Sequence, residues 1–168
     1  MTLTPRKNIF LHPGELYFGS GEVRVATLLG SCVSITLWHP IRRHGGICHF
    51  MLDSRSGDSN PLDGRYADEA MELFMAELKK QGTHQSEYEA KIFGGGNMLP
   101  IAPKAKGVCA DPACRNVAAS RRLLDRYGFS LRAEHVGGAG HRKVLFDLWS
   151  GDVWMKFHDI SQTPRAYQ

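Results

Sequence analysis

Long hydrophobic runs are absent from this sequence of 168 residues. No apolar stretch approaches the ~20 residues that a membrane helix needs. The N-terminal segment MTLTPRKNIFLHPGELYF also lacks the apolar core of a signal peptide. We therefore expect a cytoplasmic protein without membrane insertion, in which thiols stay reduced. The length and the apolar fraction of 42% predict a single domain over residues 1–168, with a core of about 15–157 and loose termini.

Cysteine is also scarce. The four cysteines are too few and too irregularly spaced for a disulfide framework. Cys109 and Cys114 have a C-x4-C spacing that is not a common zinc pair, and no second pair completes four ligands. We expect ordinary thiols at both positions and no metal. A thiol redox protein is disfavoured as well, because the sequence has no C-x-x-C motif.

Clustered charge and nucleotide motifs are missing too. The formal net charge of +4 comes from scattered basic residues without an interleaved aromatic series, so no nucleic-acid partner is expected. The run Gly94-Gly95-Gly96 lacks the Lys-Ser/Thr of a P-loop and the spacing of a dinucleotide fingerprint. We expect no cofactor and interpret this run as close backbone packing.

Alternating and helical hydrophobic periodicities predict the secondary structure. Residues 1–13 are expected to be a loose leader, and the tail from residue 159 is expected to be frayed. Two helices are expected at about 65–81 and 112–127, with caps at Asp63 and Asp111 and stops at Gly82 and Gly128. Strands are expected at 14–21, 22–29, 33–39, 47–52, 88–93, 130–136, 143–149 and 152–158. The pattern predicts an α+β fold with a mixed sheet and two main helices.

The stretch TLLGSCVSI places Cys32 behind a Gly-Ser pair between two strand-like runs. Free cysteine often packs as a small hydrophobe. A turn can instead hold a thiol clear of the core as a nucleophile, and the amides of Gly30 and Ser31 could then stabilise an oxyanion. His49 is the best candidate base, because it lies on an apolar strand face and a hairpin could return it beside Cys32. A buried structural histidine is the competing interpretation.

Five segments in register resemble one known family. TLLGSCVSITLWHP with GGICHFMLD, RYADEAMELFMAEL, EAKIFGGGNM, RNV at 115–117 and VGGAGHRKVLFDLWSGDVWMKF are similar to the CheD family, the chemoreceptor glutamine deamidases of bacterial chemotaxis. The resemblance covers about residues 15–157. It implies a layered α/β sandwich of the cysteine-hydrolase type, with Cys32 as nucleophile, His49 as its base and Thr27 as the residue that orients the imidazole. An ordinary strand threonine remains the alternative for Thr27.

The resemblance implies a protein-glutamine glutaminase that converts receptor glutamines to glutamates through a thioester, and that also acts on glutamate methyl esters. The implied partners are methyl-accepting chemotaxis receptors, through their helical cytoplasmic region, and a CheC-type phosphatase. The alternative function is a non-catalytic module that docks onto such a phosphatase and stimulates it.

Overall fold

The computed structural model describes residues 6–58, 60–99 and 109–161. Two mixed sheets are present in these ranges. One has the order β1-β3-β8-β9, from β1 (Lys7–Phe10), β3 (Val23–Leu29), β8 (Gly140–Asp147) and β9 (Val153–Asp159). The other has the order β2-β5-β4-β6-β7, from β2 (Leu16–Ser20), β5 (His44–Cys48), β4 (Val33–His39), β6 (Glu89–Gly94) and β7 (Ser130–Val136).

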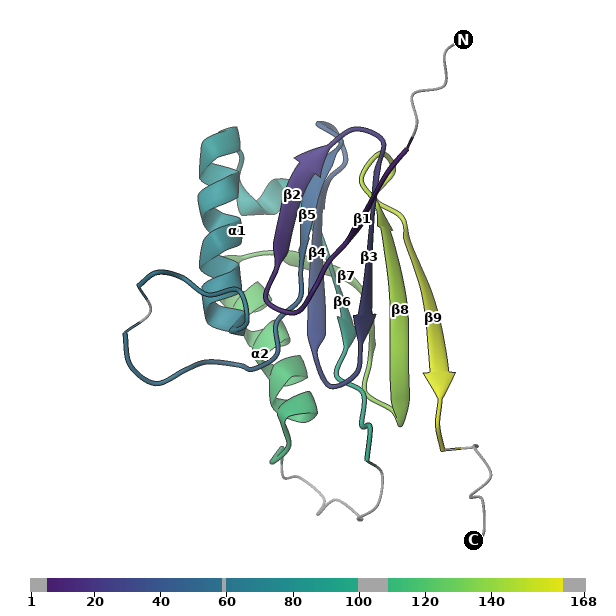
Figure 1. Cartoon of the computed structure of the whole chain (residues 1–168). Coiled ribbons are helices and arrows are strands. Elements are labelled where there is room, and N and C mark those ends of the chain that lie inside the picture. The colour runs from purple at the N-terminus through teal and green to yellow at the C-terminus, as the bar shows by residue number, and fades with distance from the viewer. Residues whose placement is uncertain (1–5, 59, 100–108, 162–168) are drawn as a thin grey trace, which may run out of the picture.

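Three layers build the molecule, as Figure 1 shows. The helices α1 (Ala67–Gln81) and α2 (Pro112–Tyr127) cover one face of the five-stranded sheet, and the four-stranded sheet lies against its other face. A short 3-10 helix, η1 (Gln85–Glu87), leads into β6. The predicted α+β class with two helices and mixed, layered sheets is confirmed. No helix in the described ranges is long and apolar enough to cross a membrane.

The central strand β4 has a hydrophobic core on each of its faces. Val33, Ile35 and Leu37 pack toward the helices, whereas Trp38 packs toward the four-stranded sheet together with Ile47 of β5. Because alternate side chains of a strand point to opposite faces, β4 separates a helix-side core from an inter-sheet core. The inter-sheet core is the layer that receives the candidate catalytic residues.

The helix ends follow the sequence signals at three of their four termini. Asp111 caps α2 by accepting from the Cys114 N–H, and Gly82 and Gly128 end the two helices in the left-handed conformation. The prediction that Asp63 caps α1 is wrong. Tyr66 occupies that position without a side-chain cap, because the Asp63 carboxylate is bound to Arg65 instead.

Two strand predictions need correction. The expected leader contains β1, which pairs in parallel with β3, and Leu11 beyond it is buried. A four-residue edge strand shows little periodicity of its own and is stabilised by a partner distant in sequence. The strand expected at 47–52 instead begins at His44 and ends at Cys48, and residues 1–5 and 162–168 of the expected loose termini lie outside the described residues.

The expectation of ordinary thiols at both ends of the C-x4-C motif is also wrong, because Cys109 and Cys114 form a disulfide. The N-terminal turn of α2 brings their Cα atoms to 5.4 Å. Cys32 and Cys48 are the free cysteines.

Candidate active site

Cys32 lies in the turn that carries the chain from β3 in one sheet to β4 in the other. Its side chain is half-buried and packs against the inter-sheet core. Three consecutive carbonyls hold this turn: Gly30 O accepts from Gly96 N at 2.8 Å, Ser31 O from Asn116 Nδ2 at 3.2 Å, and Cys32 O from Gly95 N at 2.9 Å. The predicted strand–turn–strand setting of the cysteine is therefore present.

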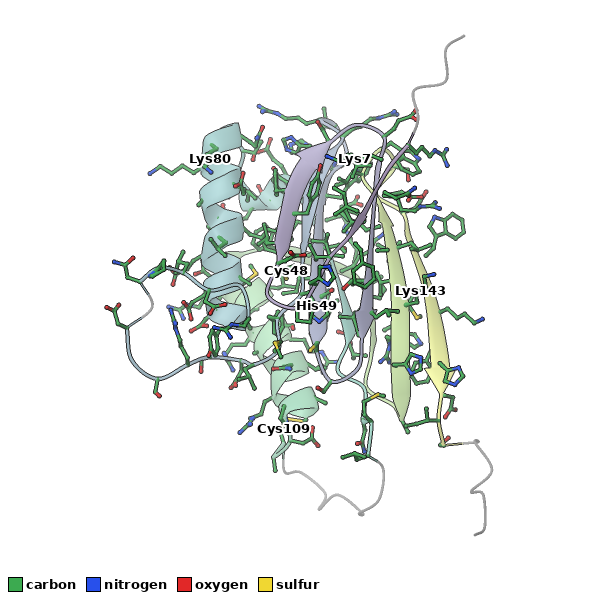
Figure 2. The ribbon with its side chains drawn as sticks, in the orientation of Figure 1. Lys7, Cys48, His49, Lys80, Cys109 and Lys143 are labelled. Atoms are coloured by element: carbon green, nitrogen blue, oxygen red, sulfur yellow. A yellow bond between two sulfur atoms is a disulfide. The ribbon has the colours of Figure 1, made fainter. Side chains whose placement is uncertain are left out.

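His49 reaches the same face from the segment that directly follows the neighbouring strand β5. Val33 and Phe50 exchange both backbone hydrogen bonds, so the antiparallel register places Ser34 opposite His49 and Cys32 opposite Met51. Side chains alternate along each strand, which leaves Cys32 and His49 as diagonal cross-strand neighbours on one face, at a typical spacing of ~7–8 Å between backbones. Figure 2 shows His49 between the two sheets, while the preceding Cys48 belongs to the helix-side core.

Thr27 of β3 contacts His49 from the opposite sheet. The Thr27 hydroxyl lies 2.7 Å from His49 Nδ1 and donates to the Leu11 carbonyl at 2.8 Å. A hydroxyl has one hydrogen, and here the carbonyl takes it, so His49 Nδ1 must carry a proton and donate to Thr27. This arrangement fixes the imidazole tautomer and leaves the Nε2 lone pair available. Within the described residues Nε2 is buried and has no hydrogen-bond partner.

Burial sets the protonation states of both groups. Desolvation, with a smaller contribution from His12, lowers the pKa of His49 to about 4, so the ring is a neutral base at neutral pH. Burial raises the pKa of the Cys32 thiol above its ordinary value. The two groups are thus a thiol and a neutral imidazole at neutral pH.

A hollow of about 440 Å³ opens at Ser31, beside the turn that holds Cys32. It continues across the loop after β6 to the start of α2, and its other lining residues are Gly96, Asn97, Met98, Leu99, Asp111, Pro112 and Ala113. Leu99 is 74% exposed and Met98 is 41% exposed, so an apolar rim faces solvent next to the site. Among the described residues, the Ser31 N–H has no protein acceptor.

The family model for CheD, described as CheD chemotactic sensory transduction, matches residues 51–157. A protein of Dechloromonas aromatica named probable chemoreceptor glutamine deamidase CheD 3 is 53% identical over 150 residues, which cover 89% of this chain and 86% of that protein. A probable chemoreceptor glutamine deamidase CheD of Pseudomonas fluorescens is 46% identical, over 95% of this chain and 90% of its own. The chain belongs to the CheD family.

The family-model match begins at residue 51, so it does not cover Thr27, Cys32 and His49. The roles of these residues in this CheD family member are therefore inferred from the geometry of the site. A solved Bacillus licheniformis structure, the hypothetical protein YfiH, aligns with a TM-score of 0.42 at 12% identity, over 68% of this chain and 47% of its own. A likeness of that size carries no argument about function.

Sequence patterns missed one residue that contacts the site of this CheD family member. Asn116 lies within the RNV motif, to which the sequence patterns assign no role, yet its side chain donates to the carbonyls of Ser31 and Met51. A buried polar residue on the inner face of an amphipathic helix was the available signal. The periodicity of α2 identified that face without identifying its partners.

Proposed function

We propose that this protein is a cysteine hydrolase that converts glutamine side chains of chemoreceptors to glutamate. The observation that carries the proposal is the hydrogen bond from His49 to Thr27, because it leaves Nε2 as a base on the face that Cys32 shares. The relatives' names supply the substrate class, and the fixed tautomer supplies the chemistry.

In the first half-reaction, His49 Nε2 takes the Cys32 thiol proton while the sulfur bonds to the glutamine Cδ. The carbonyl π electrons move to oxygen, and the Ser31 amide, in the turn that begins at Gly30, is the candidate donor to that oxyanion. His49 then gives its proton to the departing nitrogen. The C–N bond breaks, ammonia leaves and a thioester remains on Cys32.

In the second half-reaction, His49 Nε2 takes a proton from water as its oxygen attacks the thioester carbonyl. The C–S bond breaks, and the proton returns to the sulfur, so that glutamate is released and the thiol is restored. A glutamate methyl ester follows the same route with methanol as the leaving group, and this ester activity is part of the proposal.

The surface beside Cys32 suits a macromolecular substrate. Met98 and Leu99 form the exposed apolar rim of the hollow, and Met51 and Leu52, in the segment that carries His49 after β5, are also partly exposed. Contiguous exposed apolar side chains next to a reactive centre are typical of protein-binding surfaces. The helical cytoplasmic region of a receptor would present its glutamines to this rim.

Binding to a CheC-type phosphatase and a cytoplasmic location remain predictions within this proposal. A docking module without turnover would have no need for the Thr27–His49 hydrogen bond. The intact proton path therefore favours the enzyme.

The decisive experiment incubates the protein with a chemoreceptor cytoplasmic fragment and measures ammonia release and the conversion of carboxamide to carboxylate by mass spectrometry. We expect the wild type to convert helical glutamines and the Cys32→Ala variant to be inactive. Cys48→Ala is the matched control, because Cys48 is the other free thiol and lies in the helix-side core, where burial raises its pKa to about 12.

Conversion that persists in Cys32→Ala would exclude Cys32 as the nucleophile. If neither the wild type nor the Cys32→Ala variant releases ammonia, the alternative of a module that docks onto a CheC-type phosphatase is favoured instead.

A further inference from the structure

The backbone pairing between β4 and the segment after β5 ends close to Cys32, where the two chain segments separate. Val33 and Phe50 form the final pair that exchanges both backbone hydrogen bonds. The antiparallel register would next pair Ser31 with Leu52, but the Leu52 N–H donates to the Arg65 carbonyl at 3.1 Å, as does that of Met51 at 2.8 Å. The Ser31 and Met51 carbonyls on the two sides of this opening therefore need another donor.

Asn116 supplies that donor from the helix layer. Its Nδ2 donates to Ser31 O at 3.2 Å and to Met51 O at 2.8 Å, which uses both hydrogens of the amide. The residue is fully buried on α2, and Ser120 Oγ, one turn later, donates to its backbone carbonyl at 2.8 Å. The Asn116 side chain thus forms a bridge between the turn that precedes Cys32 and the segment that follows His49.

The two bridged positions are the ones that set the geometry of the catalytic pair. Ser31 directly precedes Cys32, and Met51 lies opposite Cys32 in the register and two residues beyond His49. We propose that Asn116 is a positioning residue that holds the Cys32 turn at the reacting distance from His49. The inference rests on the proposed function, and it assigns a role to the Arg115–Val117 motif that the proton path leaves unexplained.

Loss of the Asn116 side chain removes one of the three hydrogen bonds that hold the Cys32 turn, the one to the Ser31 carbonyl. Gly95 and Gly96 still hold the Cys32 and Gly30 carbonyls, so the turn keeps its shape, but Ser31 and Met51 lose their common tether. Because catalysis falls steeply when reacting groups move by about 1 Å, we expect Asn116→Ala to lower kcat about 100-fold with KM nearly unchanged. The bridge contacts only the backbone carbonyls of Ser31 and Met51, and the Met98 and Leu99 side chains of the rim lie outside it.

The test uses two measurements on the full chain. The first is kcat and KM on the receptor fragment. The second is the pH dependence of Cys32 alkylation by iodoacetamide, which needs no receptor substrate and therefore remains informative if receptor deamidation is disproved. In Asn116→Ala the released thiol becomes better solvated, and we expect the midpoint of its alkylation profile to move to lower pH.

Ser120→Ala is the matched control, because it removes a buried hydrogen bond of the same helix without touching the nucleophile turn. We expect it to lower the melting temperature while kcat and the Cys32 alkylation profile stay as in the wild type. Asn116→Ser, which keeps one hydroxyl donor, guards against an unfolded alanine variant, and we expect its kcat to lie between those of Asn116→Ala and the wild type.

The proposal is overturned if the Asn116 variants retain the wild-type kcat and alkylation midpoint. It is equally overturned if their kcat and midpoint change only as much as those of Ser120→Ala, since Asn116 would then serve folding alone.

Discussion

At the residue scale, three side chains from three chain segments divide the chemistry of the site. Cys32 is the candidate nucleophile, His49 is the candidate base, and the hydrogen bonds of Thr27 fix a tautomer in which Nε2 could accept a proton. The acceptor that fixes Thr27 in turn is a backbone carbonyl, Leu11 O, from a segment that the sequence patterns assigned to a loose leader. The proton path therefore depends on both sheets.

Removing the Thr27 hydroxyl tests the tautomer argument. In Thr27→Val the side chain keeps its shape, but His49 Nδ1 and the Leu11 carbonyl lose their partner, which costs about 1–3 kcal/mol for buried polar groups. The freed imidazole can carry its proton on Nε2, and a protonated Nε2 cannot accept the thiol proton of Cys32. We therefore expect the rate of deamidation to fall about 100-fold. Enzyme assays and urea unfolding measure the two effects.

Thr36→Val is the control for this variant, because Thr36 is another buried threonine and lies on β4 outside the proton path. It should leave the deamidation rate unchanged. Equal loss of activity in both variants would contradict the orienting role of Thr27.

The buried imidazole also predicts a pH dependence of stability. The pKa of His49 lies at about 4 in the folded protein against an ordinary value of 6.5, so the unfolded chain binds more protons between these values. The free energy of unfolding must therefore rise with pH through this window, by about 3 kcal/mol, and lose that contribution on acidification.

The contribution of His49 is isolated by comparing urea unfolding of the wild type and His49→Gln from pH 4 to pH 7, because the substituted side chain does not titrate. We expect the difference between the two free energies to change across the window. The acid limb of the wild-type kcat/KM profile, which reports the free enzyme, should lie near pH 4. A difference that is constant with pH, or an acid limb near the ordinary histidine pKa, would contradict the burial argument.

Local sequence signals account for some of these residues and not for others. The Gly-Ser turn and the strand alternation single out Cys32 and His49 as candidates, because both signals lie within a few residues of the side chain concerned. Asn116 could not be found in this way. Its partners, Ser31 and Met51, lie 85 and 65 residues away in the chain, and helical periodicity says only that a residue faces inward.

At the scale of elements, the helices follow from local sequence signals, whereas β1 depends on a partner that is distant in the sequence. Asp111 and Gly128 mark the two ends of α2 by interactions within one turn, so the sequence predicts both ends. β1 has four residues at the edge of its sheet and depends on β3, which follows more than ten residues later. The Cys109–Cys114 disulfide likewise depends on the fold of the first turn of α2 and not on the spacing alone.

The end of β6 gives a prediction at this scale, because it packs against the turn that holds Cys32, the candidate nucleophile. Gly94 has a φ of 118°, and a Cβ atom there would lie 2.2 Å from the Cys32 carbonyl oxygen. Gly94→Ala must push the Cys32 turn out of place. We expect it to destabilise the protein by more than about 1 kcal/mol and to lower deamidation about 100-fold.

Gly128→Ala provides a matched backbone control, since Gly128 also has a positive φ, of 79°, but has open space where a Cβ would stand. It should cost about 1–2 kcal/mol of stability without loss of activity. Thermal unfolding measures the loss of stability in both variants, and the rate of deamidation measures the loss of activity. Wild-type activity in Gly94→Ala would show that the turn tolerates displacement.

At the scale of the whole molecule, the candidate site is also a junction between layers. Thr27 and His49 join the two sheets by a hydrogen bond, and Trp38 of β4 donates to the Leu148 carbonyl beyond β8 at 3.1 Å. The turn at Cys32 is the covalent link between β3 and β4. The helix layer is tied to the same turn through Asn116. These cross-layer contacts argue against independent unfolding of the sheets and the helices.

We therefore expect the whole chain to unfold as one cooperative unit, as the prediction of a single domain over residues 1–168 requires. In urea, tryptophan fluorescence follows the two sheets, because Trp38 lies on β4, Trp154 on β9 and Trp149 in the turn between β8 and β9, while far-UV circular dichroism at the helical band follows α1 and α2 in the outer layer. A two-state protein gives coincident transitions by both probes. If the helical signal were lost at a lower urea concentration than the fluorescence signal, the helix layer would be a separate folding unit. Activity should then disappear with the first transition, because α2 carries the side chain that bridges the strands at Cys32.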